Sequence, residues 1–338
     1  MSRILGGHPQ AQNGPVLNLI FSSLACLLSI ELAIAQPPGP PAATIRAAGS
    51  GSPQIFLRDG QKVPTRYSGQ SLPAHSWQPL SLASADFDED GMPDLAAGFA
   101  APNGAGIVAV HRGNVDALWP YGNALRHGEP PVFLPDARVF MLPEAPDFVA
   151  AGDFDADGHW DLVTAKRGGT VLYFLRGDGR GGFAEAERVG LPGAVTALAT
   201  GEINRADGLT DIAVGVTAES GAQVLVFESP AGALRGEPEQ FPAPAAVTAL
   251  QMMPLDDDPW IDLAVAAGNQ LIVIHGRDRM LSHTKAMRAT VPAAAITRQT
   301  LPFAIRTLTA GHFTGAAPHL LDLANLAALG DDGKVHFL

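Results

Sequence analysis

The chain has 338 residues, of which 46% are hydrophobic and 17% charged, so it has the apolar residues for a sizeable core and is not a disordered chain. Its formal net charge of −12 argues against general binding to a phosphate backbone, and we expect no nucleic-acid partner. The single cysteine, Cys26, excludes an intrachain disulfide framework.

The N-terminal segment 1–35 contains an apolar run over residues 16–35 that ends in a small-x-small site and is followed by a Pro-rich stretch. This pattern predicts a Sec-type signal peptide cleaved after Ala35. An uncleaved membrane anchor and a lipoprotein processed at Cys26 are the alternative interpretations. We therefore expect a secreted, periplasmic or cell-surface protein, which contacts a membrane only if the segment is kept as an anchor.

Residues 36–53 are rich in Pro, Gly, Ala and Ser, a composition typical of a linker. The remainder, 54–338, contains five segments with one layout: a proline, a short apolar run, a turn that is acidic in most copies, and an Asp followed by apolar strand residues. The segments begin at Pro79, Pro146, Pro192, Pro244 and Pro302, and their aligned aspartates are Asp94, Asp161, Asp211, Asp262 and Asp322.

Each segment continues through a small turn into a second apolar strand that is rich in β-branched and aromatic residues. These strands are expected at 106–111, 170–175, 223–227, 270–275 and 334–338. No segment of 54–338 carries a helical apolar period with caps. A repeated unit of strands and turns with this length predicts an all-β protein, a β-propeller of four-stranded blades with about five blades visible.

The turns of the first two copies carry the strongest chemical signal. Counted from the first acidic residue, carboxylates stand at loop positions 1, 3, 5 and 9, with glycine at position 6. The candidate metal ligands are Asp86, Asp88, Asp90, Asp94 and the carbonyl of Met92 in copy one, and Asp153, Asp155, Asp157, Asp161 and the carbonyl of His159 in copy two. A flexible cage of oxygens suits Ca²⁺.

These loops are not EF-hands, because position 12 is Ala97 or Thr164 instead of Glu and a strand follows instead of a helix. The alternative interpretation is a solvated turn in which each Asp caps its own backbone. The occurrence of the pattern twice at one point of the repeat favours calcium.

The later copies depart from this pattern step by step. Copy three offers Glu202, Asn204, Asp207 and Asp211, with one extra residue before Asp207, and is a further candidate calcium site. Copy four keeps three aspartates but places prolines, Pro254 and Pro259, at positions 1 and 6, so calcium binding there stays open. Copy five has no carboxylate in its turn before Asp322 and is expected to be metal-free.

These residues resemble the FG-GAP/VCBS repeats of integrin-α-like β-propellers. Residues 86–95 and 153–162 match the family's Asp-rich loop, 98–102 is similar to its Gly-Ala-Pro segment, and 170–183 is similar to its following strand and turn. The resemblance implies calcium-stabilised blades, extracellular placement and a binding role. Family propellers usually have seven blades, so five loops leave an incomplete ring as one interpretation. A closing strand from 54–60 is another.

The nucleophile elbow, the His-Glu-x-x-His zinc motif and the phosphate-binding loop are absent from the sequence. We expect no catalytic residues, and interpret the chain as a calcium-binding scaffold module for an unidentified protein or glycan ligand. A carbohydrate-active enzyme or lectin on the same scaffold is one alternative. A degenerate fragment that needs a partner to close the ring is another. The arginines of 176–180 and 277–279 are interpreted as parts of solvated turns.

Overall fold

The computed structural model describes residues 66–67, 70–71, 77–118, 131–311, 313 and 325–338. The chain divides into two compact units, Met1–Ile34 and Ala35–Leu338, and every described residue belongs to the second. The expected signal peptide, the linker, the segment 54–60 and the turn of copy five with Asp322, apart from Phe313, lie outside the described residues. None of the helices in the described part is long and apolar enough to cross a bilayer.

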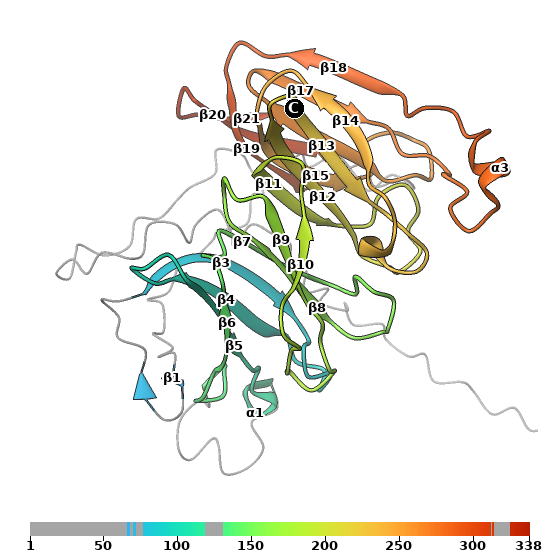
Figure 1. Ribbon diagram of the computed structural model, residues 1–338. Helices are drawn as coiled ribbons and strands as arrows, with labels where there is room; N and C mark the ends of the chain where they lie inside the picture. Colours follow the sequence, from blue (N-terminus) through green and yellow to red (C-terminus); the bar gives the residue numbers. More distant parts are fainter. Residues whose placement is uncertain (1–65, 68–69, 72–76, 119–130, 312, 314–324) are drawn as a thin grey trace, which may run out of the picture. The chain divides into compact units, whose positions relative to one another are not determined.

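The described residues of the second unit form five successive antiparallel sheets whose strands follow one another in chain order (Figure 1). The first sheet contains β3 (Gln78–Ala85), β4 (Asp94–Ala100), β5 (Gly106–His111) and β6 (Arg138–Leu142). The second contains β7 (Phe148–Gly152), β8 (Asp161–Ala165), β9 (Val171–Leu175) and β10 (Glu187–Gly190), and the third β11 (Ala194–Gly201), β12 (Asp211–Ala218), β13 (Gly221–Phe227) and β14 (Glu239–Ala243).

The fourth sheet contains β15 (Val247–Met253), β16 (Asp262–Ala267), β17 (Gln270–Ile274) and β18 (Ile296–Thr300). The described strands of the fifth are β19 (Ile305–Gly311), β20 (Asn325–Gly330) and β21 (Val335–Phe337), and a separate pair is formed by β1 (Arg66–Tyr67) and β2 (Gln70–Ser71). The second apolar strand predicted in each of the five segments is present. It is the third strand of its sheet, as β5, β9, β13, β17 and β21. The short helices α1 (Val115–Leu118), η2 (Ala233–Arg235) and α3 (Lys285–Arg288) lie in connections between third and fourth strands.

The hydrophobic core lies between neighbouring sheets, which explains why the middle strands are apolar on both faces. Every residue of β5, β8 and β16 is buried, whereas the outer strand β18 is mostly exposed. Four core clusters each combine side chains from two consecutive sheets. A single sheet therefore cannot bury its apolar faces alone, and neighbouring sheets stabilise one another.

Neighbouring sheets contact one another through their first strands: β3 contacts β7, β7 contacts β11, β11 contacts β15, and β15 contacts β19. The first strands of four sheets also share a register shift near their start, as at Val195/Ala197 and Val247/Ala249. Five consecutive four- or three-stranded sheets in this order confirm the predicted all-β fold with its blade-like repeats.

Candidate functional site

The acidic loops connect the first and second strands of the first four sheets. Because consecutive antiparallel strands reverse direction, the connection between the third and fourth strands emerges at the same end of the sheet. Hydrogen bonds join the two segments directly: the amide of Gly113, just after β5, donates to Asp94 Oδ1 at 2.7 Å. This loop end collects most of the charged contacts described below.

Loop one (86–94) is folded around the carboxylate of its first residue. Asp86 Oδ1 and Oδ2 accept the amides of Asp90 and Gly91 at 3.0 and 2.9 Å, and Asp90 Oδ1 accepts the amide of Met92 at 2.9 Å. Glu89 (φ 56°) and Gly91 (φ 88°) adopt left-handed backbone conformations that turn the chain back over Asp86. Glycine at position 6 is therefore required by the turn itself.

Loop two (153–161) repeats this arrangement. Asp153 accepts the amides of Asp157 at 3.2 Å and Gly158 at 2.9 Å, and Asp157 Oδ1 accepts the amide of His159 at 3.0 Å. Ala156 (φ 61°) and Gly158 (φ 86°) take the left-handed conformations seen in loop one. Local bonds thus account for the carboxylates at positions 1 and 5 in both loops.

The aspartate at position 9 is buried in all four described loops and ties the loop to the sheet. Each carboxylate accepts hydrogen bonds of 2.7–3.0 Å from backbone amides. The donors are Phe87 and Gly113 for Asp94, Phe154 and Gly177 for Asp161, Ile203 for Asp211, and Leu255 and Gly276 for Asp262. The aspartates predicted as metal ligands at this position, Asp94, Asp161 and Asp211, therefore also have an architectural role, which Asp262 shares.

Burial of these position-9 carboxyls without a cation disfavours their charged form. It raises the pKa of Asp94 and of Asp161 to about 6 and that of Asp211 to about 9, and nearby carboxylates add repulsion. Backbone donors oppose the shift only in part. A cation held by the loop would lower these pKa values again.

Among the carboxylate positions that loops one and two share, position 3 is the one that backbone hydrogen bonds do not explain. The side chains of Asp88 and Asp155 are 4% and 3% exposed. In each, Oδ2 pairs with an arginine, Arg112 or Arg176, while Oδ1 is buried and has no hydrogen-bond partner in the structure. A buried, unpartnered carboxylate oxygen calls for a ligand.

The structure gathers part of each predicted ligand set. Ligand atoms of Asp86, Asp88 and Asp90 lie within 4.8 Å of one another in loop one, and those of Asp153, Asp155 and Asp161 do so in loop two. Asp94 and Asp157 lie outside these two groups. All the side-chain donors are oxygens, and the groups fit a hard cation such as Ca²⁺ better than a thiol- or imidazole-preferring metal.

The loops of consecutive sheets also touch. His159 Nδ1 of loop two lies 2.7 Å from Glu89 Oε1 of loop one, and this hydrogen bond raises the pKa of His159. The amide of Thr210 in loop three donates to the carbonyl of Asp153 at 3.3 Å. Asn204 and Ile261 exchange two backbone hydrogen bonds of 2.9 Å between loops three and four. Hydrogen bonds therefore join each of these loops to the loop of the next sheet.

Loop three (202–211) keeps the turn but sends its position-3 side chain elsewhere. Glu202, one methylene longer than Asp, spans the extra residue and accepts the amides of Asp207 and Gly208 at 2.9 and 3.0 Å. Asn204 Nδ2 donates to Glu228 Oε2 at 2.6 Å, and Asn204 Oδ1 accepts the amide of Arg277 at 3.0 Å. Glu202, Asp207 and Asp211 are not gathered within 4.8 Å among the described residues.

Loop four (254–262) replaces the missing acidic residues with an imidazole. Asp256, Asp262 and His275 form a third group within 4.8 Å. His275 Nδ1 lies 2.9 Å from Asp256 Oδ2 and 3.6 Å from Asp262 Oδ1, while Nε2 lies 2.8 Å from Thr297 Oγ1. The protein itself therefore supplies a partner for these carboxylates.

The sequence analysis missed the residue that follows the third strand of each sheet. This residue reaches position 3 of its own loop four times, in the pairs Arg112–Asp88, Arg176–Asp155, Glu228–Asn204 and His275–Asp256. An Arg-Gly pair directly after the strand, at 112–113 and 176–177, was the available signal. The Arg176 side chain is 40% exposed, in keeping with the predicted solvated turn, but its guanidinium also pairs with a buried carboxylate, which was not predicted.

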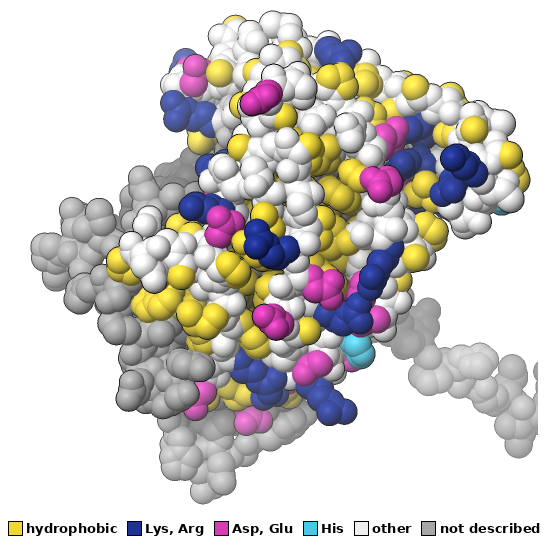
Figure 2. All heavy atoms as spheres, viewed as in Figure 1, with side chains coloured by type: hydrophobic (Ala, Val, Ile, Leu, Met, Phe, Trp, Pro, Cys, Tyr) yellow, Lys and Arg dark blue, Asp and Glu magenta, His cyan; other side chains and the backbone are white. Residues whose placement is uncertain are grey.

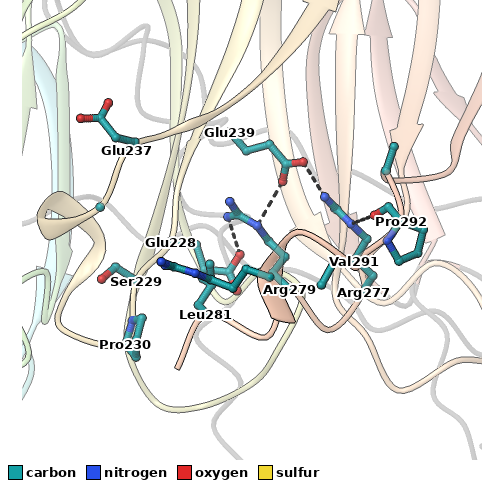
Figure 3. A pocket seen from close by; sticks show the side chains of 13 residues that line it. Glu228, Ser229, Pro230, Glu237, Glu239, Arg277, Arg279, Leu281, Val291 and Pro292 are labelled. Atoms are coloured by element: carbon teal, nitrogen blue, oxygen red, sulfur yellow. Dashed lines mark hydrogen bonds and ion pairs between the residues drawn. The ribbon is translucent and has the colours of Figure 1, made fainter. Parts of the chain in front are cut away.

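A pocket of about 600 Å³ opens at the loop end between the third and fourth sheets (Figure 3). One wall carries Arg277, Arg279 and Arg288 from the β17–β18 connection. The other carries Glu228, Glu237 and Glu239 from the β13–β14 connection and the start of β14. This pocket, called the polarised pocket below, therefore has one basic wall and one acidic wall.

Three ion pairs cross this pocket. Arg279 Nη1 lies 2.9 Å from Glu228 Oε2, Arg279 Nε lies 3.2 Å from Glu239 Oε2, and Arg277 pairs with Glu239 (Figure 3). The side chains of Arg277 and Arg279 are only 16% and 14% exposed, so the predicted solvated turn at 277–279 is wrong. More widely, the face in Figure 2 shows basic and acidic side chains interspersed, without a continuous basic surface.

Comparisons with known proteins connect these loops to a repeat family. A model described as an FG-GAP-like repeat matches residues 153–214, and a model described as an FG-GAP repeat matches residues 79–111. No curated protein sequence matches the chain.

Among solved structures, two crystal structures of BBS1N in complex with ARL6DN are similar to this chain. The one soaked with mercury is 16% identical with a TM-score of 0.46, and covers 80% of this chain and 68% of its own. The one soaked with lead is 18% identical with a TM-score of 0.47, and covers 83% and 67%.

Proposed function

Because this chain is an FG-GAP repeat protein, we propose that it is an exported, non-catalytic binding module whose loops are stabilised by calcium and whose ligand docks at the loop end of its sheets. The repeats and the blade-like sheets support a binding or scaffold module. The apolar run over 16–35 supports export. Loops on a rigid scaffold are the usual place for recognition.

The buried, unpartnered oxygens of Asp88 and Asp155 carry the calcium proposal. Asp86, Asp88 and Asp90 would hold an ion in loop one, and Asp153, Asp155 and Asp161 would hold one in loop two. A bound Ca²⁺ would supply a divalent charge that offsets the repulsion among these carboxylates. Its structural effect is to fix loops that connect neighbouring sheets.

The calcium proposal is tested by counting bound ions. The chelated full chain is titrated with Ca²⁺ in a calorimeter, beside Asp155→Asn and a control, Glu185→Gln, which alters an exposed acidic residue in the connection between β9 and β10. We expect Asp155→Asn to lower the stoichiometry by one ion and the control to leave it unchanged. An unchanged stoichiometry in Asp155→Asn would remove loop two as a site.

The polarised pocket supports a ligand site between the third and fourth sheets. Its inner arginines and glutamates are paired with one another, whereas Glu237 and Arg288, on opposite walls, are exposed and form no ion pair with another described residue. These two side chains are available to an incoming polar ligand without breaking the inner ion pairs.

The ligand class can be tested with arrays of peptides and of glycans probed with the purified protein. Binding that is lost in the double variant Glu237→Ala/Arg288→Ala and kept in Arg188→Gln, a control on β10, would place recognition in the pocket. Binding that is unaffected by the double variant would move recognition to another part of the loop end.

A further inference from the structure

We propose that Arg112 and Arg176 are built-in counter-ions that stabilise the calcium-free form of loops one and two and thereby weaken calcium binding to them. This inference rests on the proposed calcium role of the two loops. It assigns a function to two residues of this chain that lie outside the predicted ligand sets.

Both arginines occupy one point of the repeat and reach one point of the loop. Each follows the third strand of its sheet directly, after β5 or β9, and pairs with the position-3 aspartate. In the next two sheets the same residue also contacts position 3, but its chemistry changes with the partner: Glu228 accepts from Asn204, and His275 pairs with Asp256. The side chain after the third strand is therefore matched to the loop that it contacts.

The arginine uses only half of the carboxylate. Arg176 Nη2 pairs with Oδ2 of Asp155, and Arg112 Nε pairs with Oδ2 of Asp88. The Oδ1 atoms of both aspartates stay buried and unpartnered. A cation can therefore bind Oδ1 while the guanidinium still holds Oδ2, and the two positive charges then share one carboxylate group.

This sharing has opposite consequences for the two states of the loop. Without calcium, the guanidinium offsets the repulsion of Asp155 by Asp153 and Asp161, which lie in one group with it. With calcium, the guanidinium repels the ion across the carboxylate. Because the charge balance of the ligand set tunes calcium affinity, a fixed positive charge beside it reduces the affinity.

Loop two carries a second such charge from the next sheet. Arg235, at the end of η2, places Nη2 3.7 Å from Asp155 Oδ2. In loop one, Arg112 is the only described residue that forms an ion pair with Asp88. We therefore expect loop two to bind calcium more weakly than loop one.

If the arginine instead positioned the aspartate for calcium, its removal would lower the calcium affinity, which is the opposite of what the counter-ion role predicts. Groups in the outer coordination shell often orient a ligand, and their removal lowers metal affinity. The substitution Arg176→Gln can still donate a hydrogen bond but removes the charge. It therefore separates repulsion, which its loss relieves, from orientation, which its loss weakens.

The test combines calcium titration calorimetry with thermal unfolding in chelator for the full chain, Arg176→Gln and the control Arg188→Gln. Arg188 is exposed on β10 of the same sheet. We expect Arg176→Gln to lower the melting temperature without calcium, yet to tighten one calcium site about tenfold, which is the order of a charge–dication repulsion at close range. The control should change neither quantity.

Unchanged or weaker calcium binding in Arg176→Gln, with binding intact in the unsubstituted protein, would overturn the counter-ion role and leave the proposed calcium sites standing. Calcium binding that occurs only in the variant would support the role strongly. Absence of binding in both would overturn the counter-ion role together with the calcium proposal. If Arg176→Gln does not fold, Arg235→Gln, whose side chain is 51% exposed, must show a smaller tightening of the same site.

Discussion

Loop two and loop four have the same architecture but different chemistry. In both, the position-9 aspartate, Asp161 or Asp262, is buried and accepts one amide from the start of the loop and one from the glycine after the third strand. Loop two has Asp153 and Gly158 at positions 1 and 6, where loop four has prolines. The position-9 bonds are therefore kept in both loops, although only loop two has Asp and Gly at positions 1 and 6.

The two loops also differ in the groups that partner their carboxylates. In loop two, Asp155 keeps one buried oxygen unpartnered beside the Arg176 pair. In loop four, Asp256 and Asp262 face His275, whose second ring nitrogen lies 2.8 Å from Thr297 Oγ1. Loop four therefore keeps the fold of the repeat without the acidic residue at position 1, since position 9 is retained and His275 partners the remaining carboxylates.

The largest expected effect tests the shared architecture. Asp161→Ala and Asp262→Ala each leave two buried amides without an acceptor, and each should lower the free energy of unfolding by about 3 kcal/mol. The measurement is urea unfolding in chelator at pH 7.5, with Glu185→Gln as the control. If Asp262→Ala left the free energy of unfolding unchanged, loop four would not depend on position 9, and the two loops would not share one architecture.

The next effect tests the difference between the loops. Saturating calcium should stabilise the unsubstituted protein by about 2.7 kcal/mol per site at one hundred times the dissociation constant. Asp155→Asn should lose one such increment of calcium-induced stabilisation, whereas Asp256→Asn should keep them all. The readout is the thermal midpoint with and without calcium, and an equal loss in both variants would mean that loop four binds calcium as well.

The smallest effect concerns the ends of the third strands. His111 ends β5 in a buried position, where β9, β13 and β17 end in Leu175, Phe227 and Ile274. Burial lowers the pKa of His111 below its ordinary value. The unfolded chain then binds a proton that the folded chain resists, so stability should fall as the pH drops through about 6.5.

Replacing this histidine by the residue of the second sheet isolates the effect. His111→Leu should flatten the pH dependence of unfolding between pH 7.5 and 5.5, since carboxylate contributions are common to both proteins and cancel in the difference. The measurement is the urea midpoint at several pH values in chelator. Parallel pH profiles for the two proteins would contradict a neutral, buried His111.

Much of the fold could be predicted because the signals are local. Alternating apolar residues, β-branched strands and glycine turns predict the strands at 106–111 and 270–275 almost to their ends. The loop motif likewise predicts the turns, since Asp86 and Asp153 bond to amides only four and five residues away. Repetition of the motif fixes the blade-like organisation before any contact between sheets is known.

The contacts that decide the chemistry join residues far apart in the chain. Asp88 and Arg112 are 24 residues apart in the chain, Asn204 and Arg277 are 73 apart, and Glu239 and Arg277 are 38 apart. The first distance depends on the pairing of strands within one sheet, and the other two depend on how the third sheet packs against the fourth, which local propensity does not encode. The sequence by itself determined an all-β repeat protein with acidic loops. Only the tertiary structure, in which the end of each third strand lies beside the first loop of its own sheet, decided which carboxylates have an internal counter-ion and which also keep a buried, unpartnered oxygen.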